Sequence, residues 1–325
     1  MRRRLITIAP VAMAAASLAG AGRAFAQQGF PSKPMRIITP YQSGSSVDGM
    51  ARIIGAKLSE SLGQPVLIDP KPGANTVIGS EALVKSPADG YTLLLVSTTH
   101  VLNGLLVHNL PYDTFKDFAP VATIAGSELI LVASPKVPAT TVKELVAYGK
   151  TKQLTYATSS AGGPTHIAAE LFSQLTGIKL THIPYKGSGP AVTDLLGGHV
   201  DIGWTSPLTV IPHINAGKLK GIAISGDRRA PALPNVPTFS EAGIQGFDMR
   251  FWYALLAPAG TPKDIVNRIS GEVAKILATP DMKEKLAAQG AEPFISTPEQ
   301  FAAVMRADSA RYDKVIKAAG IKLAE

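Results

Sequence analysis

The sequence predicts an α/β fold of two lobes, in which helices cover parallel sheets and two strands cross between the lobes. Short apolar runs alternate with longer stretches whose apolar residues recur at helical spacing, which is the pattern of strand–helix units. Roughly 300 residues follow an N-terminal leader, long for one domain and sufficient for two. The chain has no Cys, which excludes disulfides, thiolate metal sites and a Cys nucleophile, and its 46% hydrophobic residues supply the core instead.

The first 26 residues predict export. Arg2–Arg4 give a positive start, Leu5–Gly22 form an apolar, Ala-rich run, and Ala24-Phe25-Ala26 is a small-x-small cleavage site. This layout is typical of a signal peptide cleaved after Ala26, so we expect a periplasmic mature protein. A membrane anchor is the alternative, but Pro10 interrupts the run and no second apolar span follows. Sec and twin-arginine export both stay open.

The charge balance favours small anions as ligands. Removal of the leader takes away four Arg residues and lowers the net charge from +8 to +4. No basic cluster interleaved with aromatic residues occurs, so we expect no nucleic-acid partner.

Strands and helices are predicted in alternation along most of the chain. The expected strands are Met35–Thr39, Val66–Ile68, Leu93–Val96, Ile130–Ala133, Leu154–Ala157, Leu180–Ile183, Ile202–Trp204 and Leu219–Ile224. The expected helices are Val47–Leu62, Thr76–Val84, Val142–Lys150, Thr165–Leu175, Ala191–Leu196, and then Pro262–Ala278, Met282–Gln289 and Pro298–Ala319. In the first helix one apolar stripe contains Val47, Met50, Ala51, Ile54, Leu58 and Leu62.

Two segments are predicted to cross between the lobes, namely Val121–Ala125 and Met249–Ala257. Two crossings place residues 27–124 together with 251–325 in lobe 1, and residues 125–250 in lobe 2. Ligands of such sheets bind beyond the carboxyl ends of the strands, so we expect a cleft between the lobes.

Three strand-to-helix turns are rich in Ser, Thr and Gly, namely Tyr41–Ser46, Ser97–His100 and Thr158–His166. Helix starts expose unpaired N–H groups and a partial positive charge, and hydroxyls add further donors. These turns therefore predict a carboxylate site. The alternative is simple helix capping by Ser46 and Thr165.

Catalytic and metal-binding motifs are missing from the sequence. It contains no G-x-S-x-G elbow and no phosphate-binding loop, and its six His residues lack metal-ligand spacing. We therefore expect no enzyme activity, no metal and no cofactor. His166 is interpreted as a helix-start residue that contacts its own loop. Trp204 is a candidate for stacking on an aromatic ligand, with core packing as the alternative.

Nine motifs in order resemble the Bug proteins, which are the solute-binding proteins of tripartite tricarboxylate transporters. They begin with Lys33–Ile38 and Asp48–Arg52 and continue with Pro72–Asn75, Pro87–Leu93, Asp117–Val121, Pro184–Gly187, Gly198–Asp201, Pro237–Gly243 and Ala257–Pro262. The resemblance covers essentially the whole mature chain. It implies two Rossmann-like lobes joined by two crossover strands, as in type II periplasmic binding proteins, closing on a carboxylate or amino acid.

The resemblance also implies that the loops Tyr41–Ser46 and Ser159–His166 hold the ligand. The family usually has Pro-Pro-Gly-Gly where this chain has Gln42-Ser43-Gly44-Ser45, which adds hydroxyl donors. The predicted ligand-binding residues are Tyr41, Ser43, Gly44, Ser45, Ser46, Asn75, Ser97, Thr98, Ser159, Ser160, Gly162, Gly163, Thr165, His166 and Trp204.

We therefore expect a monomer that captures a small organic anion and passes it to integral-membrane transporter subunits. The ligand class is a di- or tricarboxylate, an aromatic acid or an acidic amino acid. A binding protein that presents its ligand to a periplasmic sensor kinase is the first alternative, because it needs the same liganded form. An enzyme of the same fold is the second.

Overall fold

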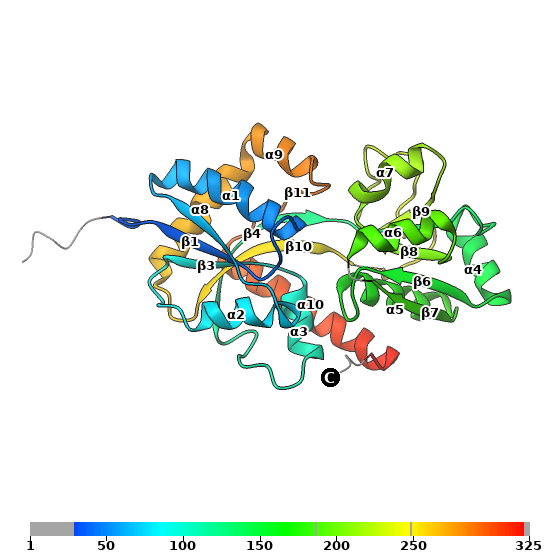
Figure 1. The fold of residues 1–325 in the computed structure, drawn as a ribbon, viewed down its shortest axis with the longest axis horizontal. Coiled ribbons are helices and arrows are strands. Elements are labelled where there is room, and N and C mark those ends of the chain that lie inside the picture. Colours follow the sequence, from blue (N-terminus) through cyan, green and yellow to red (C-terminus); the bar gives the residue numbers. More distant parts are fainter. Residues whose placement is uncertain (1–28, 186, 248, 322–325) are drawn as a thin grey trace, which may run out of the picture.

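The computed structural model describes residues 29–321 except Lys186 and Asp248. The predicted signal peptide lies outside the described residues. Two α/β lobes lie side by side along the longest axis of the molecule (Figure 1). None of the described helices is long and apolar enough to cross a membrane.

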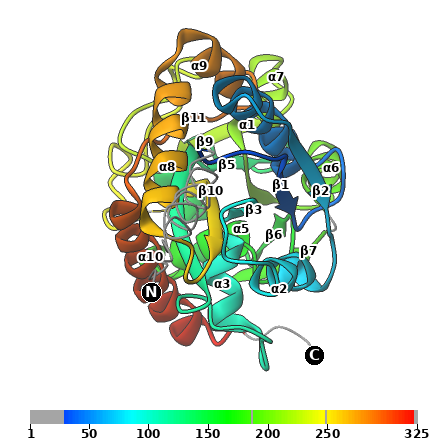
Figure 2. The same cartoon turned by 90° about the vertical axis from the view of Figure 1, so that its left-hand side faces the viewer.

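Lobe 1 contains a six-stranded sheet in the order β11-β4-β10-β3-β1-β2. Its strands are β1 Met35–Thr39, β2 Val66–Pro70, β3 Thr92–Ser97, β4 Phe118–Ser127, β10 Phe251–Pro258 and β11 Glu292–Pro293. Its helices are α1 Ser46–Leu62, α2 Val77–Val84 after the 3-10 turn η1 Ala74–Thr76, α3 Thr99–Leu106, α8 Lys263–Ala278, α9 Pro280–Ala287 and α10 Pro298–Ala319. Figure 2 shows α1 and α9 above the strands of this lobe and α2 and α3 below them.

Lobe 2 contains a five-stranded sheet in the order β7-β6-β8-β5-β9. Its strands are β5 Ile130–Ala133, β6 Leu154–Thr158, β7 Leu180–Pro184, β8 Ile202–Thr205 and β9 Lys220–Ile224. Its helices are α4 Val142–Thr151, α5 Pro164–Thr176, α6 Ser188–Gly197 and α7 Pro207–Asn215. The chain enters this lobe after β4 and leaves it before β10, so the two predicted crossover strands are confirmed.

The sheets are mixed, which corrects the prediction of parallel sheets. β1, β2 and β3 are parallel, and so are β6, β7 and β8. The crossover strand β10 runs antiparallel to both β3 and β4, and β5 runs antiparallel to both β8 and β9. Each of these strands follows a direct passage from the other lobe rather than a helical crossover, so the rule for parallel strand–helix–strand units does not apply to it.

The sheet of lobe 1 is apolar on both faces because alternate residues of its strands meet different helices. Ile37, Leu93 and Leu95 pack with the stripe of α1 and with α8 and α9. Ile38, Leu94 and Val96 pack on the other side with α2, α3 and α10. The predicted α1 stripe is buried from Val47 to Leu58, and Leu62 is partly buried.

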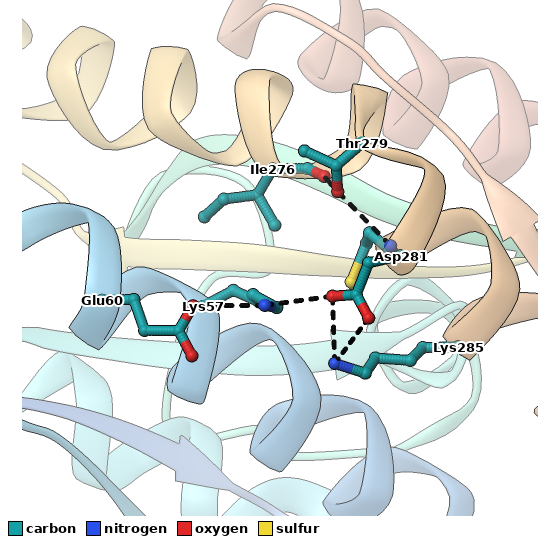
Figure 3. Close-up of polar contacts among 7 residues, drawn as sticks. Lys57, Glu60, Ile276, Thr279, Asp281 and Lys285 are labelled. Atoms are coloured by element: carbon teal, nitrogen blue, oxygen red, sulfur yellow. Dashed lines mark hydrogen bonds and ion pairs between the residues drawn. The ribbon is translucent and has the colours of Figure 1, made fainter.

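Helix α9 is attached to α1 by an ion-pair group (Figure 3). Lys57 Nζ on α1 lies 3.0 Å from Asp281 Oδ2 and 3.1 Å from Glu60 Oε2, and Lys285 also pairs with Asp281. The hydrogen bond to Asp281 contributes most to raising the pKa of Lys57. Thr279 caps α9, because its Oγ1 accepts the Met282 N–H at 3.3 Å. These ion pairs connect α9 to the first helix of lobe 1.

Helix α10 spans both lobes. It packs on β4 and α3 of lobe 1 and on α5 of lobe 2. Buried Asp308 on α10 accepts the Trp252 Nε1–H at 2.7 Å, and Gln174 on α5 donates to Val315 O at 3.0 Å. The two lobes are therefore joined by α10 as well as by the crossover strands β4 and β10.

Candidate ligand-binding site

The turn after α9 contacts the first turns of two helices that follow parallel strands, one in each lobe. Gly290, which follows α9 in lobe 1, lies against Leu208 in the first turn of α7, the helix that follows β8 in lobe 2. The neighbouring Gln289 side chain lies beside Gly49 in the first turn of α1, which follows β1. The predicted loops Tyr41–Ser46 and Ser159–His166 follow β1 and β6, so each loop lies at the carboxyl-terminal edge of the parallel strands of its own lobe.

The loop Tyr41–Ser46 is organised by Ser45 and Asp48. Ser45 Oγ accepts the Asp48 N–H at 3.2 Å, so Ser45 is the N-cap of α1 and the expectation of Ser46 in this role is wrong. Asp48 Oδ2 accepts the Gly44 N–H at 3.0 Å, and this ties the loop to the helix. Gly44 adopts φ +84°, a left-handed conformation that favours glycine. Ser43 and Gly44 are exposed and Ser45 is half-buried.

Asp48 is ionised at the base of this loop. Its side chain is almost fully buried, and Arg52 Nε donates to its Oδ2 at 2.9 Å. Burial opposes ionisation, but the hydrogen bonds from Arg52 and Gly44 outweigh it and hold the pKa of Asp48 below its usual range. The N–H groups of Ser46 and Val47 lie in the first helical turn, before the intrahelical bonds begin, and can donate to a ligand there.

The second predicted turn is joined to the first by hydroxyl groups. Tyr41 OH and Ser97 Oγ lie 2.7 Å apart, and Ser97 Oγ donates to Thr99 Oγ1 at 3.2 Å. Thr98 is fully buried, and its Oγ1 accepts the Trp252 N–H at 3.1 Å. Thr98 therefore joins the end of β3 to the crossover strand β10.

Asn75 lies in a strained turn before α2. Ala74, Asn75 and Thr76 have φ values of 44°, 49° and 78°, and left-handed non-glycine residues cost roughly 1–3 kcal/mol each. Asn103 on α3 holds this turn, because its Nδ2 donates to Asn75 O at 2.5 Å and to Thr76 Oγ1 at 2.9 Å. Its Oδ1 accepts from Asn75 Nδ2 at 2.7 Å. The Asn75 side chain is exposed at the loop edge, while Asn103 is buried and was not found from the sequence.

The loop Ser159–His166 in lobe 2 is held by its own side chains. The Ser159 N–H donates to Thr165 Oγ1 at 3.3 Å, and the Gly162 N–H donates to His166 Nδ1 at 3.0 Å. Gly163 is the N-cap of α5, so the alternative expectation that Thr165 caps this helix is wrong. A Cβ atom at Gly163 would lie 2.2 Å from Ser160 Oγ, so a side chain there would require the Ser160 hydroxyl to rotate away. The contact predicted between His166 and its own loop is confirmed.

His166 is neutral near neutral pH. Its ring stacks on His182 with the ring centroids 3.9 Å apart. Burial, followed by the neighbouring His182, lowers the pKa of His166 to about 4. Nδ1 accepts from Gly162, so the proton of the neutral ring sits on Nε2, the atom 3.9 Å from Glu170 Oε1.

Trp204 packs in the core of lobe 2, which was the alternative to stacking on an aromatic ligand. The ring is 2% exposed and packs edge-on against Phe172 and Tyr156. Strand β8 is buried along its whole length, so its side chains pack into lobe 2 on both faces.

Sequence reasoning missed the turn from β8 to α7. Thr205 Oγ1 is buried and has no hydrogen-bond partner among the described residues. Ser206 is the N-cap of α7 without a side-chain cap bond, and Pro207 is the first helical residue. A Ser-Pro pair after a strand is a helix-start signal that would have found this helix.

A small cavity of about 140 Å³ lies at the crossover strands and not at these loops. Its lining includes Ser127, Glu128, Phe251 and Glu292, and none of the predicted ligand residues. The described residues hold no group of three or more His, Asp or Glu side chains that would bind a metal ion.

Two α/β lobes, two crossover strands and hydroxyl-rich turns at the carboxyl ends of parallel strands define the class of two-lobed periplasmic binding proteins. Within that class, the chain belongs to the tripartite tricarboxylate transporter receptor family, whose model matches residues 50–321. This is a family of extracytoplasmic solute-binding receptors and not of enzymes.

Individual relatives agree with this assignment. Protein BugT of Bordetella pertussis is 37% identical over 98% of both chains. A Rhodopseudomonas palustris protein solved with adipate superposes with a TM-score of 0.80 and 35% identity, covering 90% of this chain and 99% of that one. MatC of the same organism, solved with bound malate, gives a TM-score of 0.75 and 30% identity, covering 88% of this chain and all of that one.

Proposed function

We propose that the protein captures a small carboxylate between its lobes and delivers it to a membrane transporter of the tripartite tricarboxylate type. The observation that carries this proposal is the pair of hydroxyl- and N–H-rich helix starts, at α1 in lobe 1 and α5 in lobe 2, each at the carboxyl ends of parallel strands. Relatives with the same fold hold adipate and malate, which supports a dicarboxylate as the first candidate. Aromatic acids, tricarboxylates and acidic amino acids remain within the proposed class.

In this proposal Ser43, Ser45, Asn75 and the first turn of α1 supply the contacts from lobe 1. Ser159 and Ser160, which are half-buried, supply those from lobe 2. Ser97, Thr98, Thr165 and His166 hold the loops in shape from behind. A protein of the same kind that serves a sensor kinase is the second candidate, and it needs the same site.

A binding screen tests the carboxylate proposal. Thermal unfolding is measured with malate, adipate, citrate, benzoate and glutamate, and calorimetry then gives Kd for each acid that stabilises the protein. A ligand at 100 times its Kd adds about 2.7 kcal/mol to the free energy of unfolding. An absence of stabilisation by any of these acids would reject the proposed ligand class. Uptake of the bound acid by cells lacking the protein then separates delivery to a transporter from presentation to a sensor.

We also propose that the chain is exported and cleaved after Ala26. Mass spectrometry of the periplasmic protein should then find Gln27 at the N-terminus. A full-length chain retained in the membrane would contradict this.

A further inference from the structure

Gly290 brings the backbones of the two lobes into direct contact. A Cβ atom at Gly290 would lie 2.4 Å from Leu208 Cβ, 3.3 Å from Leu208 N and 3.4 Å from Leu208 Cα. Real Cβ atoms do not approach other carbons to 2.4 Å, so the observed packing is possible only without a side chain at this position.

The turn conformation alone does not account for this close approach. Gly290 adopts φ +67°, and Gly63 and Gly320, which follow α1 and α10, adopt 68° and 64°. A Cβ at Gly63 or Gly320 would meet nothing within 4 Å. All three glycines permit a left-handed turn after a helix, but only Gly290 also permits contact with another lobe.

The Gly290 segment is fixed from both lobes. Ser127 Oγ, at the end of crossover strand β4, donates to Gly290 O at 2.9 Å. Two residues further on, Glu292 forms an ion pair with Arg228 of lobe 2. The turn lies between the first turn of α7 and the first turn of α1, where Gln289 lies beside Gly49. The thickness of this turn therefore sets the distance between the first turn of α1, which carries the proposed ligand loop of lobe 1, and the first turn of α7 in lobe 2.

We propose that Gly290 is a positioning residue for ligand binding, because its missing side chain lets the lobes close to the spacing at which one ligand spans both. A methyl group at this position would hold the lobes apart and lower the population of the closed form. A ligand that touches both lobes binds that form preferentially, so its affinity falls with the closed population. This effect on affinity rests on the carboxylate function proposed above, whereas the effect on lobe spacing does not.

The test compares Gly290→Ala with Gly63→Ala. Both substitutions place Ala in a left-handed turn after a helix and strain the backbone alike, but only the first meets Leu208. Lobe closure is measured without ligand through Arg228→Cys and Glu292→Cys, whose native side chains pair across the lobes. The natural chain has no Cys, so a short bis-maleimide reports on this pair alone.

In the Arg228→Cys, Glu292→Cys variant, Gly290→Ala should slow cross-linking about tenfold, and Gly63→Ala should leave the rate unchanged. Tenfold is the effect expected of moderate overpacking. In the native background, Gly290→Ala should weaken Kd for the acid identified in the screen by a similar factor. Adding Leu208→Gly removes the atom at 2.4 Å and should restore both quantities, which separates a steric effect from misfolding.

Equal cross-linking rates in Gly290→Ala and Gly63→Ala would overturn the proposal, as would a failure of Leu208→Gly to restore the rate. If no carboxylate binds the wild-type protein, the proposed function fails, but the cross-linking rates still decide whether Gly290 sets the lobe spacing.

Discussion

Ser45→Ala tests whether the first ligand loop uses hydroxyl groups. Ser45 Oγ accepts the Asp48 N–H at 3.2 Å as the N-cap of α1, and its own proton donates to no acceptor recorded among the described residues. Loss of the cap costs about 1 kcal/mol, which lowers the melting temperature by about 2–4 °C in a domain of this size. Loss of a hydrogen bond to a charged ligand costs a further 1.5–3 kcal/mol or so of binding free energy, which is about tenfold or more in Kd.

Thr141→Ala is the matched control. Thr141 caps α4 with the same geometry, since its Oγ1 accepts the Glu144 N–H at 3.2 Å. Helix α4 lies at the far end of lobe 2 (Figure 1), away from the predicted ligand loops. Thr141→Ala should therefore lower the melting temperature by a similar amount and leave Kd unchanged.

Calorimetry on both folded variants, with the acid found in the binding screen, separates stability from binding. If Kd for Ser45→Ala matches Kd for Thr141→Ala, the Ser45 hydroxyl is only a helix cap. The ligand would then be held in this loop by backbone N–H groups, as the family's Pro-Pro-Gly-Gly version implies.

For three other changes, the structure determines whether stability or Kd should rise or fall. Burial and His182 lower the pKa of His166 to about 4, so below pH 6.5 the unfolded chain binds a proton that the folded protein excludes. The His166 proton should lower the free energy of unfolding by on the order of 3 kcal/mol between pH 6.5 and 4. In urea titrations, the free energy of unfolding of His166→Asn should decrease less over this pH range by the same amount. Asn103→Ala removes three hydrogen bonds and should lower the free energy of unfolding, measured in urea, by about 3 kcal/mol. Asn75→Gly removes one of these bonds and relieves the strain of a left-handed residue, so it should lower the free energy of unfolding far less. Kd for the acid should rise less than threefold or so between 0.05 and 0.5 M NaCl, because the predicted contacts include no Lys or Arg, and a steep dependence would point to a cationic contact.

The sequence predicted the elements that have strong periodicity and missed those that depend on neighbours. Helix α1 was found because its apolar stripe repeats over four turns, and its residues are buried as expected. Helix α7 was missed because it is nine residues long, begins at Pro207 and contains Pro212. The direction of β5 and β10 was also missed, because periodicity shows that a strand is buried but not which way it runs.

The site shows the same limit at the level of single residues. Ser43, Ser45 and Ser46 are all suitable caps, and only Asp48, three residues after Ser45, marks the true one. That spacing is visible in the sequence and would have identified Ser45. The role of Asn103 was not visible, because it depends on contact with a turn 28 residues earlier in the chain. The contact of Gly290 with Leu208 likewise joins segments that only the fold brings together.

The predicted ligand contacts include no charged side chain, although the proposed ligand is an anion. Asp48 is ionised at the base of the first loop, and Arg52 balances its charge. His166 is held neutral in the second loop. What remains for a carboxylate is a set of hydroxyls, N–H groups and two helix starts. These dipoles bind an anion without a permanent opposite charge. A buried cation would hold its partner strongly and would be costly to leave unpaired. If the protein delivers its ligand to a transporter, as proposed above, dipoles serve it better, because water replaces their hydrogen bonds when the lobes open.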